Sequence, residues 1–292
     1  MSRPVNKIAK GTLLLLTFAL CRLTPAQTKT VEITDGRPVA KAVQMLEGVY
    51  GVPITYEDPI AVHGSQLQDV TRQVQRTPNP SHKVVVQKDV TFSFALKTPS
   101  RRHSASSETV QDRWRSDSEV ADAISSVLDG YLASGGPVTF TTSEEDGIFH
   151  IIPTNYLDEE GKMRGATPIL DTKVTIPPTV RTADSLLGEI CLALSKSIGT
   201  RVEEGTAPTN LLLQRRTSVS GSDVTARSLL NKLLVELANP ASENADRPDG
   251  QNVQRPLEVR GDHRAIQLSW ELFYGPGWGY VLNLHPVTLD AE

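Results

Sequence analysis

The six histidines of the chain are the first candidates for metal or acid–base chemistry, and they lie at positions 63, 82, 103, 150, 263 and 285. No two of them have the His-x-x-x-His spacing that places two imidazoles on one helical face, so the sequence predicts neither a zinc nor an iron site. His150 and His285 fall in or beside predicted strands that close the two halves of the chain. We interpret both as partly buried strand histidines, which would meet only if the halves packed together.

Adjacent carboxylates are the second candidates, because paired carboxyls can act as general acid and base. They occur at Glu144-Glu145-Asp146, Asp158-Glu159-Glu160 and Glu203-Glu204, each in a predicted turn, linker or strand end. Glycosidase-type catalysis needs two carboxyls held across a cleft, which adjacency in sequence does not provide. The chain also lacks the Gly-x-Ser-x-Gly elbow and the phosphate-binding Gly-x-x-x-x-Gly-Lys loop. We therefore predict no catalytic residue, no metal and no cofactor.

The most distinctive cluster is aromatic, in a sequence with only 5% aromatic residues. Trp270, Tyr274, Trp278 and Tyr280 lie on a predicted hairpin around Gly275-Pro276-Gly277. Such side chains stack on sugars or anchor protein partners when they are exposed. They form a candidate binding surface, and the alternative is a central strand whose two faces are both covered.

The first 26 residues have the organisation of an export signal. Basic residues precede an apolar run, Gly11–Cys21, that is too short to cross a bilayer, and Thr24-Pro25-Ala26 offers a small residue to signal peptidase. We predict cleavage between Ala26 and Gln27 and a periplasmic or secreted protein that meets the membrane only during export. The alternatives are an inner-membrane anchor formed by an uncleaved signal, and a lipoprotein acylated at Cys21.

Charge and cysteine content narrow the function further. Four of the 30 basic residues and none of the 34 acidic ones lie in residues 1–26, so cleavage would change the net charge from −4 to −8. A nucleic-acid binder needs a basic stripe, and the chain has none, so we expect no nucleic-acid partner. Cys191 would be the only remaining cysteine, which excludes an intramolecular disulfide. Its place in an apolar helical pattern predicts a buried side chain.

Hydrophobic periodicity predicts an α+β fold in which one order of elements occurs twice. We expect two tandem sandwiches after the signal peptide, each with the order strand, helix, strand, strand, helix, hairpin. The first unit covers residues 27–155, the linker 156–171 and the second, more divergent unit 172–292. Because each unit has its own striped helices and closing hairpin, we expect the two to fold separately. Further loops are expected at 64–81, 99–115 and 239–262.

Two segments of the first unit resemble a known family. Residues 38–59, PVAKAVQMLEGVYGVPITYEDP, and Gly147–Pro153, GIFHIIP, are similar to the N-terminal domains of secretins and the short signalling (STN) domain of TonB-dependent receptors. The resemblance extends more faintly over Lys173 to Val287. It implies a periplasmic docking element that contacts a protein through sheet edges and helix faces. No channel, plug or barrel sequence follows, so secretion and receptor signalling are not implied.

These observations predict an exported, non-enzymatic docking or adaptor module of the bacterial cell envelope, with an envelope protein as partner. The alternative is an envelope glycan-binding protein or hydrolase whose site is assembled from distant residues. An uncovered sheet edge would favour docking. An aromatic-lined cleft with convergent carboxylates would favour the alternative.

Overall fold

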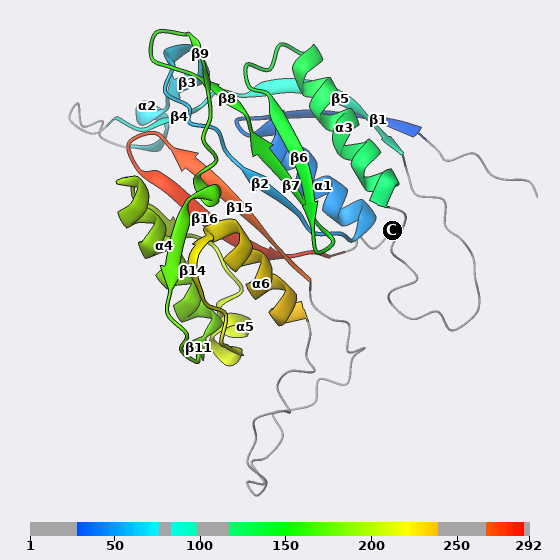
Figure 1. Ribbon diagram of the computed structural model, residues 1–292. Helices are drawn as coiled ribbons and strands as arrows, with labels where there is room; N and C mark the ends of the chain where they lie inside the picture. The colour runs from blue at the N-terminus through cyan, green and yellow to red at the C-terminus, as the bar shows by residue number, and fades with distance from the viewer. Residues whose placement is uncertain (1–27, 76–82, 98–116, 239–266, 289–292) are drawn as a thin grey trace, which may run out of the picture.

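The computed structural model describes residues 28–75, 83–97, 117–238 and 267–288 (Figure 1). Helices and strands are mixed throughout this part of the chain, which confirms the predicted α+β class. The predicted cleavage site at Ala26 and Gln27, the acylation candidate Cys21 and the expected loops at 99–115 and 239–262 lie outside the described residues. No helix in the described ranges is long and apolar enough to span a membrane.

The first unit begins with a strand and a helix and ends with a hairpin. Its elements are β1 (Thr28–Asp35), α1 (Pro38–Tyr50), β2 (Ile54–Glu57), η1 (Gly64–Gln66), β3 (Leu67–Asp69), α2 (Thr71–Val74), β4 (Val85–Gln87), β5 (Val90–Lys97), α3 (Asp117–Ala133), β6 (Phe140–Glu145) and β7 (Ile148–Pro153).

The second unit repeats the order of the main elements after a short connecting region. The connecting region holds β8 (Asn155–Leu157), β9 (Met163–Gly165) and η3 (Ile169–Asp171). The unit itself contains β10 (Lys173–Ile176), β11 (Arg181–Thr182), α4 (Ala183–Ile198), β12 (Val202–Glu204), α5 (Thr209–Gln214), β13 (Arg216–Thr217), β14 (Gly221–Thr225), α6 (Ala226–Ala238), β15 (Leu268–Gly275) and β16 (Gly279–Pro286).

Matching glycines end the first helix of each unit and define how the two units align. Gly51 after α1 and Gly199 after α4 both adopt the left-handed conformation, with φ of 65° and 68°. Each donates its N–H to the carbonyl four residues earlier, on Glu47 or Ser195. This C-cap favours glycine because a Cβ is strained at positive φ. In each unit the next strand starts three residues after the glycine, so Ile54 is equivalent to Val202.

Strands of both units form one six-stranded sheet in the order β12-β16-β15-β2-β7-β6. Each unit contributes the same three-stranded piece: a parallel pair, β2 with β7 or β12 with β16, followed by an antiparallel hairpin partner, β6 or β15. The two pieces join where β15 runs parallel to β2, with Glu271 opposite Tyr56 and Leu272 opposite Glu57. The outer strands β12 and β6 lie at opposite ends of the sheet.

Helices cover both faces of this sheet, and each unit covers a different face (Figure 1). On one face α1 and α3 pack over Ile54, Phe149 and Ile151 in a core that belongs almost entirely to the first unit. On the other face α4 and α6 pack over Trp270 and Leu282 in a second core. The arrangement is a helix, sheet and helix sandwich.

Two segments expected as linker or loop contain regular structure. Within the expected linker, β8 and β9 pair as a hairpin, and the buried Leu170 anchors η3 in the second core. The expected loop at 64–81 contains β3, which pairs with β4, and the short helix α2. Both differences arise because two- or three-residue ladders carry too little periodicity to be recognised from sequence.

Candidate functional site

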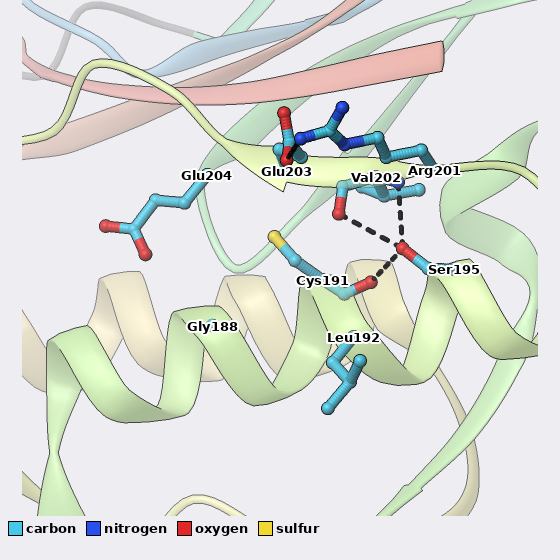
Figure 2. Close-up of a pocket in the computed structure, with 8 residues that line it drawn as sticks. All are labelled: Gly188, Cys191, Leu192, Ser195, Arg201, Val202, Glu203 and Glu204. Carbon is cyan, nitrogen blue, oxygen red and sulfur yellow. Dashed lines mark hydrogen bonds and ion pairs between the residues drawn. The ribbon is translucent and has the colours of Figure 1, made fainter. Parts of the chain in front are cut away.

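An open groove of about 650 Å³ runs along the outer side of β12, between this strand and α4 (Figure 2). Within the described residues β16 is the only strand partner of β12, so one side of β12 is an uncovered edge. Figure 2 shows Cys191 and Ser195 pointing from α4 toward the strand, and Leu192 projecting away from it at the rim. The groove is lined by Gly188, Cys191, Leu192, Ser195, Arg201, Val202, Glu203 and Glu204.

Ser195 caps the backbone of Val202, the first residue of this edge. Its hydroxyl accepts a hydrogen bond from the N–H of Val202 at 2.8 Å and lies 3.1 Å from the carbonyl oxygen of the same residue. It also lies 2.8 Å from the carbonyl of Cys191, to which it can donate. The edge that a partner strand could use therefore begins beyond Val202, at Glu204.

The equivalent place in the first unit shows how such a groove is filled. There the Glu47 carboxylate accepts the N–H of Ile54 at 2.9 Å, in the role that Ser195 plays for Val202. Beyond this cap, β15 pairs with β2, and the N–H of Asp58 donates to the carbonyl of Leu272 at 2.8 Å. The position equivalent to Leu192 is Gln44, which donates to Glu271 of β15 at 3.0 Å. The groove beside β12 is thus the unfilled counterpart of an occupied strand-docking site.

The chemistry of the groove favours binding over catalysis. Burial, reinforced by the nearby Glu204 charge, raises the pKa of the Cys191 thiol to about 12, so this cysteine is protonated and a poor nucleophile. Burial also raises the pKa of Glu204, with a further contribution from Asp184. Leu192 is 55% exposed and gives the rim an apolar contact.

Polar groups with unusual environments lie inside the junction between the units. His150 is buried, contacts Thr55 at 2.6 Å and Asn231 at 3.1 Å, and stacks on Trp270. Burial lowers its pKa to about 4, and the Arg227 charge acts in the same direction. These contacts are structural, because the buried ring already has partners from both units.

The two strand histidines do not meet, although the units do pack together. His150 faces the core of the second unit, whereas His285 lies 2.7 Å from the Glu47 carboxylate on the opposite face of the sheet. Each histidine therefore contacts a residue of the other unit. His150 is more deeply buried than expected, with 1% of its surface exposed.

The four aromatic residues of the last hairpin do not form one surface. Trp270 and Tyr280 are buried core residues, and Tyr274 is half-buried against the Tyr280 ring. Trp278, at the hairpin turn, is 68% exposed. The alternative of a covered strand describes Trp270 on β15 and Tyr280 on β16, because both strands have neighbours on each side in the sheet and both residues are buried.

A second cavity, of about 310 Å³, lies beside the start of α1 and the end of α3. Tyr56, Tyr131 and Phe140 line it, together with Gln66, whose side-chain carbonyl oxygen is buried without a hydrogen-bond partner among the described residues. No local pattern predicts this cavity, because its residues come from several separated segments. Only folding brings these aromatic rings together.

The remaining carboxylate runs do not converge on either cavity as an acid–base pair. Glu144 and Glu145 lie on β6, and the side chain of Glu145 accepts a hydrogen bond from Asn231 at 2.8 Å. Asp158 forms an ion pair with Arg164 in the β8–β9 region. Among the described residues no group of three or more His, Cys, Asp or Glu side chains is arranged to hold a metal ion.

Comparison with known proteins finds no family model that matches the chain, no curated protein with a similar sequence and no solved structure with a similar fold.

Proposed function

We propose that the protein is an exported, non-enzymatic docking module of the bacterial cell envelope that binds an extended segment of a partner protein along β12. The observation that carries this proposal is the pair of equivalent grooves. The groove between α1 and β2 holds a strand, β15. The groove between α4 and β12 has an equivalent cap, Ser195 in place of Glu47, but β12 has no second strand partner among the described residues.

Strand addition explains how a groove without reactive groups achieves affinity. An extended segment pairs its backbone with the uncovered edge of β12, and its side chains on one face contact α4 at Leu192. The preferred direction is parallel to β12, as β15 is to β2. Glu203 forms an ion pair with Arg201, so the unpaired negative charge of this edge is that of Glu204. It disfavours a segment that places a carboxylate directly opposite Glu204.

The proposed location rests on the basic and apolar pattern of residues 1–26 and on the resemblance of the first unit to secretin and STN modules. Those modules are periplasmic docking elements. An envelope protein that presents an extended segment is therefore the class of partner we propose.

The proposal can be tested with a photoreactive amino acid placed at Leu192 in cells that produce the protein. Met163 is a matched control, because it is 50% exposed but lies on β9, away from the groove. We expect a discrete crosslinked protein from Leu192 that is absent from Met163. Equal crosslinking at both positions, or none at Leu192, would contradict docking at this groove. The mass of the adduct identifies the partner.

The aromatic cavity supports a second candidate, an envelope glycan-binding protein. Tyr56, Tyr131 and Phe140 line the cavity with aromatic rings, of which the first two are nearly buried, and the unsatisfied Gln66 amide provides a polar contact of the kind that sugars use. The neighbouring Asp58 is paired with Arg37 at 2.6 Å, which favours binding over hydrolysis. Titration with peptidoglycan fragments should show saturable binding that Gln66→Leu weakens. Absence of binding to the unmodified protein would remove this candidate.

A further inference from the structure

The two units are repeated along the sheet in a way that leaves complementary edges at its ends. Alignment of the hairpins places β6 in the position of β15. Ile151 of β7 is equivalent to Leu282 of β16, and their partners across the hairpin are Thr142 and Leu272. Alignment of the helices places β12 in the position of β2. The junction inside the chain is therefore made by the equivalents of the two outer strands. One end of the sheet is β6, the equivalent of β15, and the other end is β12, the equivalent of β2.

The operation that relates the units is a two-fold screw along the sheet. β15 runs antiparallel to β12 of its own unit but parallel to β2 of the other, so β12 and its equivalent β2 run in opposite directions. The helices also change face, with α4 and α6 on one side and α1 and α3 on the other. A screw operation does not close on itself, so the same contact can be repeated by another copy.

We propose that the occupant of the β12 groove is β6 of a second copy of this chain, so that copies assemble head to tail into an open-ended continuous sheet. This inference rests on the proposed docking function and names its partner. It is carried by continuity with the junction already present inside the chain. The contact is heterologous, and the twist of the sheet makes the resulting assembly helical.

Transfer of the internal register to the new contact gives specific neighbours. Glu271 opposite Tyr56 becomes Thr141 opposite Glu204, and Leu272 opposite Glu57 becomes Thr142 opposite Gly205. Thr141 and Thr142 are exposed and have high β propensity. In this register no carboxylate of β6 lies directly opposite a carboxylate of β12. The acidic residues on both edges therefore permit the proposed register and disfavour the larger shifts that would place Glu144 or Glu145 opposite Glu204.

The same transfer predicts which backbone groups face outward. The Leu272 carbonyl faces β2, and the Val202 N–H faces the free edge of β12, where Ser195 caps it. Thr206, the equivalent of Asp58, already donates its N–H to the Asn283 side chain at 2.8 Å, so the donor left for a partner is that of Glu204. Because alternate residues of a strand face the same neighbour, Thr142 and Glu204 present their N–H groups to the free edges. A proline at either position would remove an outward donor and spare the internal ladder, as prolines on natural edge strands do.

The decisive experiment measures the mass distribution of the mature chain and of Thr142→Pro and Glu204→Pro variants by sedimentation velocity. We expect concentration-dependent oligomers for the unmodified protein and monomers for each variant alone. Because each variant keeps one intact edge, an equimolar mixture of the two should form a 1:1 dimer that does not grow further. Oligomers that persist in both variants, or a mixture that stays monomeric beside an assembling parent, would overturn the inference.

A second pair of variants covers the case in which a proline disturbs folding. Thr141 is exposed and faces Glu204 across the proposed contact, so Thr141→Glu should weaken assembly and Thr141→Lys should strengthen it. Equal assembly of the two would contradict the register. A parent protein that stays monomeric while Leu192 crosslinks to a different protein in cells would overturn self-assembly and leave the docking function standing. Failure of both measurements would reject both proposals.

Discussion

The guanidinium of Arg227 donates to the carboxylate of Glu57 at 2.7 Å, across 170 residues of chain and across the junction of the two units. Both side chains are buried, with 7% and 1% of their surfaces exposed. Arg227 also pairs with Asp171 and lies 5.6 Å over the Trp270 ring. α6 of the second unit is thereby tied to β2 of the first, next to the place where β15 joins that strand.

Removal of this arginine should be strongly destabilising. Burial raises the pKa of Glu57, and the Arg227 charge opposes that rise. Arg227→Met would leave the carboxylate unpaired, and we expect a loss of about 3–5 kcal/mol in the free energy of unfolding. The exposed Arg164, paired with Asp158, is a control for which Arg164→Met should cost about 0–1 kcal/mol. Denaturant titration measures both. Addition of Glu57→Gln to Arg227→Met should recover part of the loss.

Glu271 should make the protein less stable as the pH rises toward neutrality. Burial raises its pKa to about 7 in the folded chain from 4.5, although His285 opposes the shift. The folded state therefore holds this proton more tightly than the unfolded state. Its contribution is complete below pH 4.5 and is lost as the pH rises through 7. The difference corresponds to on the order of 3 kcal/mol.

The variant Glu271→Gln isolates that effect, because a glutamine stays neutral and can still bond Gln44. Unfolding free energies measured between about pH 4 and 8 should fall less for Glu271→Gln than for the unmodified protein. Glu144→Gln, on the exposed outer strand, serves as the control. Parallel curves for the unmodified protein and Glu271→Gln would show that Glu271 does not carry the dependence.

The first unit should fold without the second, at reduced stability. A fragment of residues 27–160 keeps the core under α1 and α3 but loses Arg227, the partner of Glu57, and β15, the partner of β2. We expect a cooperative thermal transition at a lower temperature than that of the mature chain. A fragment without a cooperative transition would show that the two units are one intertwined domain.

The proposed export predicts a defined N-terminus. Intact-mass measurement on protein recovered from the cell envelope should give a chain that begins at Gln27, because Ala26 ends the only segment with signal-peptide organisation. A mass that retains Met1 would indicate an uncleaved anchor. A lipid-bearing N-terminal Cys21 would place the protein among lipoproteins.

The sequence predicts the local elements well because their signals are local. The apolar stripe of α1, Pro38 at its start and Gly51 at its end define that helix from neighbouring residues alone. The twofold order of elements follows from the same kind of signal. Neither the bounds of α1 nor the order of elements depends on contacts between residues far apart in sequence.

The junction could not be predicted, because its partners are far apart in sequence. Glu57 and Asp58 have the character of a polar strand end, yet they are only 1% and 2% exposed because Arg227 and Arg37 reach them. Trp270 is a candidate surface aromatic from the sequence, whereas the structure buries it on β15, which pairs with β2. The groove at β12 exists because this strand has a partner on one side alone among the described residues. A local sequence pattern does not indicate which side of a strand is paired.

The most direct test of the account is a disulfide between copies in the register proposed for β6 and β12. In a Cys191→Ala background, Thr141→Cys and Glu204→Cys would face each other at the roughly 4.8 Å spacing of neighbouring strands, within the Cα separation that disulfides span. Mild oxidation should give a ladder of covalent multimers. Ser143→Cys with Glu204→Cys, two residues out of register, should give far less. A protein that remains monomeric, or equal crosslinking from both pairs, would contradict head-to-tail docking at this edge.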